Sequence, residues 1–313
     1  MKVVIPGGTG QVGTILARAF HHAGYDVVIF SRKTAPSPWR VVTWDAKTLG
    51  SWVSEIDGAN VVINLAGYNV NCRYHQQNRE LIKNSRVEST RVVGEAIARA
   101  SSPPEVWLQA STATIYAHRY DAPNDEHGII GGSEENSPDT WRFSIDVAKS
   151  WERTLNEAVV PQTRKILLRS AMIMSPDRGG VFDTLLGLTR HGLGGPAGDG
   201  KQYVSWIHDL DFIRAIFWII EREDLKDHVN LSSPNPLPNA DFMRILREAW
   251  GIRIGLPAAI WMLEIGALLL RTETELILKS RRVLPGKLQE LGFVFKFPNW
   301  PEAARDLCKR WRE

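Results

Sequence analysis

The stretch VVIPGGTGQVG, residues 3–13, joins an apolar run to a cluster of glycines and then to a helical pattern. The apolar run predicts a short buried strand that enters a turn. After the glycines, apolar residues from Val12 to Phe20 recur at the spacing of a helix, and Gly24 is a typical C-terminal stop. The glycines therefore lie between a strand and a helix, which is the arrangement that begins a dinucleotide-binding fold.

Three of these glycines, Gly7, Gly10 and Gly13, follow one another at steps of three. Gly7 permits a tight turn, Gly10 permits a close approach of the backbone to a ligand, and Gly13 lets the helix pack on the strand. The first N–H groups of the helix are then free to bind a pyrophosphate. The spacing and its context predict a dinucleotide site rather than an ordinary glycine-rich loop.

The end of the second predicted strand, YDVVIFSRK at residues 25–33, indicates which dinucleotide is bound. An acidic residue near this point holds the ribose 2′-hydroxyl of NAD, and none is present. Arg32 can instead pair with a 2′-phosphate, and Ser31 can donate a hydrogen bond to it. This pattern favours NADP(H); the alternative is that Arg32 and Lys33 are ordinary loop cations.

Further strands and helices alternate along the chain, which predicts an α/β fold: a Rossmann-type doubly wound parallel sheet. We expect a NADP(H)-binding domain over residues 1–174, joined by a later strand near 228–232, and a smaller, mostly helical substrate lobe over 175–313. The other predicted strands are 40–45, 59–67, 105–111 and 164–174, and the predicted helices are 77–100 and 139–158.

Composition excludes several classes of partner. The 313 residues carry a formal net charge of +3 without a basic tract, so nucleic acid is not expected. The two cysteines, Cys72 and Cys308, have no metal-binding spacing and fit a reducing, cytoplasmic compartment. The apolar residues 254–270 include Pro257 and Glu264, so they predict a buried helix and no membrane span. The expected partner is a small-molecule substrate, and the oligomeric state stays open.

Several motifs add a resemblance to a known family. GGTGQVG, INLAG and ASTATIYA resemble an extended short-chain dehydrogenase/reductase of the NAD-dependent epimerase/dehydratase type. Longer motifs, such as RELIKNSRVEST, GLGGPAGDGKQYVSWIHDLD and LKSRRVLPGKLQELGFVFKFP, resemble its atypical "epimerase family protein" subgroup, which has a short C-terminal domain of its own. The resemblance implies a Rossmann fold, an NADP(H) site and a substrate that it does not identify.

The family's usual catalytic residues are a Ser or Thr, a Tyr, and a Lys four residues after the Tyr. Counted back from Glu152, the Lys position holds Ala148 and the Tyr position holds Ser144. Neither residue can perform the usual proton transfer. Thr112 does match the Ser/Thr position. Lys149 is one residue away, about 100° around a helix, so we expect it to be solvated.

Another group must therefore supply a proton if the protein turns over a substrate. Tyr116, at the end of the fifth strand, is the candidate acid, with Thr112 or Ser111 orienting the substrate oxygen. Tyr116 and His208 have the alternative role of packing residues. A second departure is Val204, where sugar-nucleotide epimerases commonly carry an Arg for the diphosphate. Arg190 and Lys201 are candidates to replace that Arg.

Two functions fit these observations. The first is an NADP(H)-dependent oxidoreductase or epimerase acting on a small carbonyl or sugar-type substrate. The second is a non-catalytic NADP(H)-binding sensor or scaffold. Both functions use the same predicted cofactor site, in which Asp45 is placed to reach the adenine amine. The residues of this site are Gly7, Thr9, Gly10, Gln11, Val12, Gly13, Ser31, Arg32, Asp45, Leu65, Ala66 and Gly67.

Overall fold

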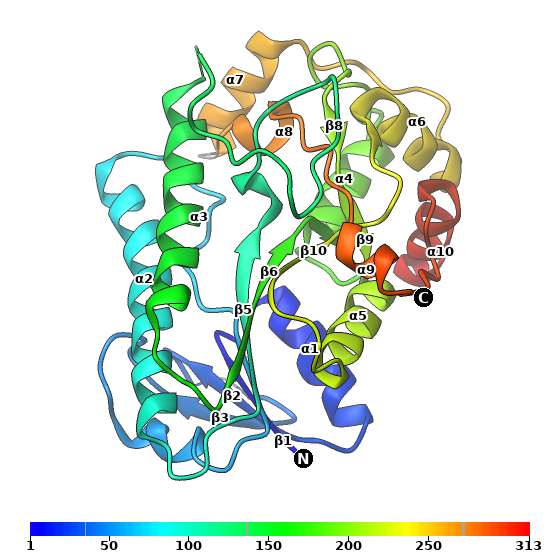
Figure 1. Cartoon of the computed structure of the whole chain (residues 1–313). Coiled ribbons are helices and arrows are strands. Elements are labelled where there is room, and N and C mark those ends of the chain that lie inside the picture. Colours follow the sequence, from blue (N-terminus) through cyan, green and yellow to red (C-terminus); the bar gives the residue numbers. More distant parts are fainter. Residues whose placement is uncertain (35, 136, 271–272) are drawn as a thin grey trace.

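A seven-stranded parallel sheet forms the centre of the protein. The computed structural model describes residues 1–34, 36–135, 137–270 and 273–313 (Figure 1). The strands lie in the order β10-β6-β5-β4-β1-β2-β3. Their bounds are β1 (Lys2–Pro6), β2 (Asp26–Ser31), β3 (Arg40–Thr43), β4 (Val61–Asn64), β5 (Val106–Thr112), β6 (Arg164–Ser170) and β10 (Asp227–Leu231). The predicted Rossmann-type sheet is confirmed, including the late strand that returns to it.

The strand order reverses at β1, and this reversal positions the site. From β1 the chain first builds outward through β2 and β3, and then crosses to β4 on the other side of β1. Val3 and Val4 of β1 pair with β2 on one side and with β4 on the other. The two crossovers leave in opposite directions, which opens a crevice at the carboxyl ends of the strands where ligands bind in such sheets.

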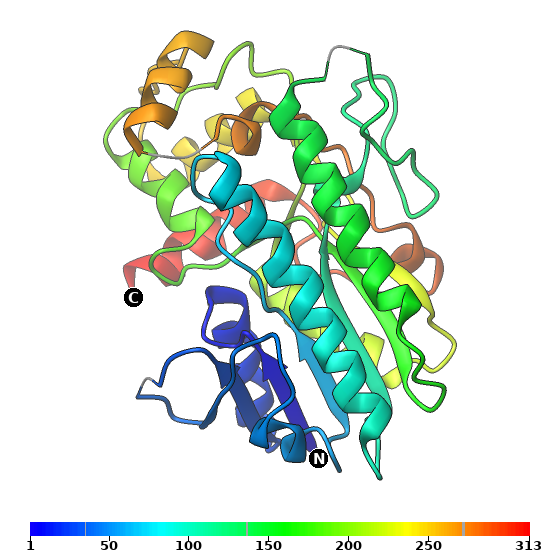
Figure 2. The ribbon, with the colours of Figure 1, turned by 90° about the vertical axis from the view of Figure 1, so that its left-hand side faces the viewer.

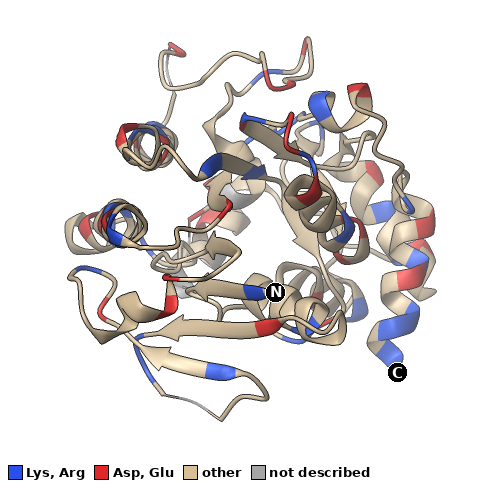
Figure 3. Cartoon of the chain, turned by 60° about the horizontal axis from the view of Figure 1, so that its bottom comes forward, with Lys and Arg blue, Asp and Glu red and all other residues tan. Residues whose placement is uncertain are grey.

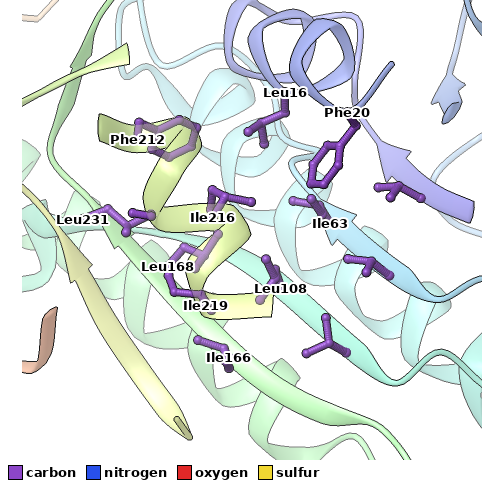
Figure 4. Close-up of a cluster of buried hydrophobic side chains, with 14 of the residues drawn as sticks. Leu16, Phe20, Ile63, Leu108, Ile166, Leu168, Phe212, Ile216, Ile219 and Leu231 are labelled. Carbon is purple, nitrogen blue, oxygen red and sulfur yellow. The ribbon is translucent and has the colours of Figure 1, made fainter. Parts of the chain in front are cut away.

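Helices cover both faces of the sheet. In Figures 1 and 2, α2 (Gln76–Arg99) and α3 (Asp139–Glu157) run side by side on one face, and α1 (Gln11–His22) and α5 (Asp209–Glu221) cover the other. The second face is closed by a hydrophobic cluster from the sheet, α1 and α5, shown in Figure 4. Phe20, Phe212 and Ile216 are almost completely buried in it. Burial of such side chains contributes about 1.5–3 kcal/mol each.

Helix α5 was not anticipated from the sequence. It lies after residue 174, where we expected only the substrate lobe, yet its buried face packs on the sheet. Helix α5 leads directly to β10, so residues 209–231 belong structurally to the sheet layer. For the rest of the chain, outside residues 209–231, the domain boundary at residue 174 stays a prediction.

The remaining elements form the predicted helical lobe over the carboxyl ends of the strands (Figure 1). Its core is aromatic, with Phe242 stacked on Trp300 at 4.0 Å between ring centroids. Two small sheets, β7-β9 and β8-β11, connect the lobe to the main sheet. Apart from the short helices η1 (Ser51–Glu55) and η2 (Ala113–Ile115), which lie in the Rossmann part, the elements are β7 (Met172–Met174), α4 (Val181–Arg190), β8 (Tyr203–Val204), β9 (Trp206–His208), β11 (Leu237–Pro238), α6 (Asn239–Trp250), α7 (Ile260–Leu270), α8 (Glu275–Leu278), α9 (Gly286–Glu290) and α10 (Trp300–Arg312).

The apolar helix α7 differs from its prediction, because several of its described apolar side chains are exposed. Trp261 is 65 % exposed and Ile265 is 52 % exposed. The other residue named in that prediction, Leu268, has a side chain outside the described residues. Helix α7 lies at the top of the molecule in Figure 1, at the edge of the lobe. Among the described residues, the structure contains no helix long and apolar enough to cross a membrane.

Charged side chains are distributed over the whole molecule. In Figure 3, acidic and basic residues alternate along the helices and loops, as the modest net charge predicts. The C-terminal helix α10 carries both signs, and its Arg310 forms an ion pair with Asp209 of α5 at 2.7 Å. Charge therefore ties the lobe to the sheet layer.

Candidate functional site

The glycine turn after β1 shows why Gly7 and Gly13 are required by the fold. Gly7 has φ +76°, and a Cβ there would lie 2.7 Å from the backbone of Ala66. A Cβ on Gly13 would lie 2.4 Å from the Cα of Gly8. Gly10 differs, since its Cβ would meet only the Gly7 carbonyl oxygen, at 3.8 Å. The space beside Gly10 is thus left open at the start of α1.

The N-terminus of α1 faces this open space with its own backbone donors. Gly10 is the N-cap and supplies no side-chain hydrogen bond, and the first turn contains no acidic residue. The first N–H groups of a helix have no partner within the helix. The Nε2 of Gln11 is a buried donor with no hydrogen-bond partner among the described residues. The backbone donors match the oxygens of a pyrophosphate, which helix N-termini bind well.

The ends of β2 and β3 lie beside the turn. The N–H of Gly7 donates to the Phe30 carbonyl over 2.9 Å, which brings Ser31 and Arg32 next to the glycine turn. Ser31 is buried and Arg32 is exposed. Asp45 accepts three hydrogen bonds within its own turn, and those from Thr48 lower the pKa of its carboxyl. Its predicted contact with adenine stays a prediction.

The end of β4 completes this edge of the sheet. The Leu65 N–H donates to the Pro6 carbonyl over 2.8 Å, and the Ala66 N–H donates to Asn64 Oδ1 over 3.1 Å. These bonds hold Ala66 against Gly7, and Gly67 follows beside the guanidinium of Arg86. The structure therefore gathers the predicted cofactor residues from the ends of four adjacent strands, β4, β1, β2 and β3; their contacts with a nucleotide stay predictions.

A pocket of about 230 Å³ opens next to this edge, between α2, α3, the end of β5 and the C-terminal region. It contains the positions at which the family's catalytic residues are expected, namely Thr112, Ser144 and Ala148. The lining residues are Val70, Tyr74, Ile82, Arg86, Ser111, Thr112, Thr114, Phe143, Ser144, Val147, Ala148, Trp151, Glu275 and Arg281.

The structure places Tyr116 differently from the expectation that it is the acid of this pocket. Tyr116 is 2 % exposed, and it does not line the pocket. Its hydroxyl donates to Asn230 Oδ1 over 2.8 Å and accepts from Arg169 Nη1 over 3.0 Å. Arg169 is paired in turn with Glu152. With both hydrogen-bonding roles used inside the protein, Tyr116 has the packing role, and the geometry does not support it as the general acid.

The two smaller hydroxyls of the prediction do reach the pocket. Ser111 donates to Glu152 Oε1 over 2.6 Å, and Thr112 Oγ1 accepts from the Thr114 N–H over 3.1 Å. Both residues line the pocket. Ser111 is therefore bonded to the same carboxylate as Arg169, and Thr112 retains a hydroxyl proton for a ligand.

Three cations and a histidine considered from the sequence lie away from the pocket. Lys149 is exposed, as predicted, and borders a separate surface depression. Arg190 stacks over the ring of Trp311 at 4.5 Å, and Lys201 is exposed. His208 is completely buried, with its Nε2 3.0 Å from Asp306 Oδ2. None of the four lines the pocket.

Sequence reasoning missed the charged residues that do line the pocket. Arg86 lies in the middle of α2, and its Nη1 donates to the carbonyls of Tyr68 and Ile82. Its guanidinium lies over the ring of Trp151 at 5.0 Å, and burial lowers its pKa to about 10. In the sequence, Arg86 is one of several cations in a helical pattern, so it carries no signal of its own.

Glu275 and Arg281 enter the pocket from the C-terminal region. Ser144 Oγ donates to Glu275 Oε2 over 2.5 Å, and Arg281 Nε donates to Thr114 Oγ1 over 3.1 Å. Burial raises the pKa of Glu275 and lowers the pKa of Arg281. Both residues are more than 120 positions away from the Rossmann residues they contact, and no local pattern could pair them.

Comparisons with known proteins agree with this geometry. The model of the NAD dependent epimerase/dehydratase family matches residues 3–232, and a domain of unknown function, DUF1731, matches residues 260–307. The human epimerase family protein SDR39U1 is 29 % identical over 98 % of this chain and 99 % of its own length. An epimerase family protein of Staphylococcus haemolyticus is 30 % identical over 98 % of both chains.

Solved structures show the same relationship. A crystal structure of human SDR39U1 with NADPH superposes with a TM-score of 0.85 at 26 % identity and covers 99 % of both chains. A UDP-glucose 4-epimerase from Thermotoga maritima, solved with UDP-glucose, has a TM-score of 0.76 at 16 % identity over 100 % of this chain and 99 % of its own, and this likeness concerns the fold alone.

Proposed function

The chain belongs to the NAD dependent epimerase/dehydratase family, and we propose that it binds NADP(H) and acts as an oxidoreductase or epimerase on a small carbonyl or sugar-type substrate. The observation that carries this proposal is the open cradle at Gly10. Gly7 and Gly13 are fixed by contacts within the protein, whereas Gly10 faces free space and bare helix donors. The similar human protein, whose crystal structure contains NADPH, supports the choice of cofactor.

Named residues would hold each part of the cofactor. Gly10 and Gln11 would hold the pyrophosphate, and Ser31 with Arg32 would hold the 2′-phosphate. Trp151 lies one helical turn after Ala148 on α3. Arg86 of α2 lies over the ring of Trp151 and against Gly67, so it would supply the positive charge that the family's usual lysine would provide at position 148. Bound NADPH would supply a hydride, and the pocket beside it would hold the substrate.

Binding and turnover are tested separately. Calorimetry with NADPH and NADH should show tighter binding of NADPH. NADPH absorbance is then followed with a panel of aldehydes, ketones and sugar nucleotides, and a substrate-dependent decrease would identify an oxidoreductase. The absence of binding to either cofactor would refute the proposal.

A non-catalytic NADP(H) sensor or scaffold is the second candidate. The observation that favours it is the presence of Ser144 and Ala148 in place of the Tyr–Lys pair. Such a protein would bind NADPH with a measurable change in stability, and no compound in the panel would alter the absorbance. The buried Glu275 Oε1 beside the pocket, which has no hydrogen-bond partner among the described residues, favours the enzyme.

A further inference from the structure

Ser144, at the expected position of the catalytic tyrosine, is bonded to a carboxyl group from a distant part of the chain. Its Oγ donates to Oε2 of Glu275, which lies 131 residues later at the start of α8. Glu275 is 1 % exposed and lines the same pocket as Ser144 and Thr112. The C-terminal region therefore inserts a carboxyl group into the place where the family's usual acid is missing.

The other oxygen of this carboxyl has an unused hydrogen-bonding capacity. Oε1 of Glu275 is buried and has no hydrogen-bond partner among the described residues. A buried polar atom without a partner destabilises the fold, so such atoms are rare unless a ligand completes them. Since Ser144 already donates to Oε2, a proton on the carboxyl belongs on Oε1, which a substrate oxygen would have to reach from the pocket that Glu275 lines.

The surroundings of Glu275 favour its neutral form but also stabilise its charge. Burial is the largest influence and raises the pKa of the carboxyl, and the nearby Glu273 raises it further. Arg281, the Ser144 hydroxyl and Lys279 act in the opposite direction. A general acid must be neutral before it transfers its proton, and its anion must be stabilised afterwards. The surroundings of Glu275 satisfy both conditions.

We propose that Glu275 is the proton donor and acceptor of this pocket, acting on the substrate oxygen in place of the missing tyrosine, with Ser144 as its positioning residue. This inference rests on the proposed function. In the reduction of a carbonyl, bound NADPH would supply the hydride to the carbon, and the C=O electron pair would move to oxygen. That oxygen would take the proton from Glu275 Oε1, which would leave an alcohol, NADP⁺ and the Glu275 carboxylate. The reverse direction returns the proton to Glu275.

Tyr74 is the competing proton donor in the pocket. It is 7 % exposed, and its backbone N–H is held by Glu273 Oε1 over 2.7 Å. Burial and the neighbouring Glu275 raise the pKa of its phenol to about 12. A phenol with this pKa is a poor donor near neutral pH, because catalytic acids work best with a pKa near the working pH. The variants below distinguish the two residues.

The first measurement compares cofactor binding with turnover. Glu275→Gln keeps the size of the side chain and removes the acid, so NADPH affinity should be unchanged while the turnover of the best carbonyl in the panel falls roughly 10²–10⁴-fold. Glu264→Gln is the matched control, because Glu264 is an exposed carboxylate of α7 that hydrogen-bonds to Thr274. It should retain the wild-type rate, and Tyr74→Phe tests the competing phenol, which lines the same pocket.

The second measurement needs no substrate. The infrared C=O band of a protonated carboxyl is followed during a pH titration, and the band of Glu275 is taken from the difference between the wild-type chain and Glu275→Gln. We expect its midpoint above the ordinary pKa of a glutamic acid, because burial favours the neutral form. Ser144→Ala should shift the frequency of the band by removing the hydrogen bond to Oε2, and Ser144→Thr should restore it.

The outcomes separate this inference from the proposed function. A wild-type chain that binds neither NADPH nor NADH contradicts the proposed function. If the wild-type chain binds NADPH but the Glu275→Gln variant keeps full turnover, only the role of Glu275 is overturned. The same holds if Tyr74→Phe is the only variant that loses turnover. A Glu275 band that titrates at the ordinary carboxyl pKa also overturns it.

Discussion

The glycines of the first turn are expected to respond differently to substitution. Gly10→Val adds a side chain to open space, where it meets only a carbonyl at 3.8 Å, so the chain should fold normally. It should lose NADPH binding, because the branched methyls would occupy the space of the pyrophosphate. Gly13→Ala places a methyl 2.4 Å from Gly8 and should destabilise the fold by about 1–3 kcal/mol. Thermal melts and calorimetry on both variants test this; normal NADPH binding by Gly10→Val would show that the motif is only a turn.

Arg32 provides the test of cofactor preference at the same scale. It is exposed at the end of β2 beside the buried Ser31. A charge-assisted contact with the 2′-phosphate contributes about 1.5–3 kcal/mol, so Arg32→Ala should weaken NADPH binding on the order of tenfold or more. NADH has no 2′-phosphate and should bind with unchanged affinity. Lys33→Ala is the neighbouring control in the same calorimetric series. Equal affinities of the wild-type chain for the two cofactors would contradict the prediction.

Residues were predictable from the sequence where a local rule governs them. The roles of Gly7 and Gly13 follow from turn geometry over a few positions, and Lys149 follows from the rotation of one residue along α3. Tyr116 was assigned to the pocket because it follows β5, but its ring direction depends on Asn230 and Arg169, far along the chain. Glu275 reaches Ser144 through tertiary structure alone, and no spacing rule could indicate it.

At the scale of elements, the exposed helix α7 is the largest departure from expectation. Its apolar sequence predicted burial, yet Trp261 and Ile265 are more than half exposed. The double variant Trp261→Glu with Ile265→Lys should leave the melting temperature within roughly 2 °C of wild type, because surface substitutions usually change stability by less than about 0.5 kcal/mol. Binding of a hydrophobic fluorescent dye should decrease, since the exposed apolar area is reduced. A large drop in melting temperature would instead place these side chains in a core.

The strands of the sheet were predictable because their residues are apolar on both faces and end in glycine or polar turns. The segments β1, β2, β4 and β6 have almost uninterrupted burial, which matches the pattern of a parallel sheet covered by helices. Helix α5 was not predicted, although its buried residues recur at helical spacing. It follows loop-rich segments that directed attention to the substrate pocket instead.

At the scale of the whole molecule, the C-terminal region is joined to the Rossmann part by backbone and buried polar contacts. The Asn124 N–H donates to the Arg282 carbonyl over 2.7 Å, and the Leu284 N–H donates to the Asn124 carbonyl over 2.8 Å. Lys279 is 1 % exposed, and its Nζ donates to the Thr114 carbonyl over 2.8 Å. This junction closes the pocket that contains Glu275, so its stability and the integrity of the site are coupled.

The buried Lys279 gives this junction a characteristic dependence on pH. Burial is the largest influence and lowers the pKa of its ammonium from 10.5 to about 8, and the nearby Arg281 lowers it further. Between these two values the unfolded chain holds a proton at this site that the folded chain has released. The free energy of unfolding therefore rises with pH across that window, and this contribution is flat at lower pH where both states are protonated.

Lys279→Met removes the titrating group while keeping a side chain of similar length. The free energy of unfolding of wild type minus that of Lys279→Met should increase from pH 8 to 10 by roughly 2 kcal/mol, since each unit of pH contributes at most about 1.4 kcal/mol. Taking the difference between the two chains cancels the titration of groups they share, such as the exposed Tyr120. Denaturant unfolding at several pH values measures it. A difference that stays constant over this range would mean that Lys279 keeps its ordinary pKa, and hence that solvent reaches it where the C-terminal region meets the sheet.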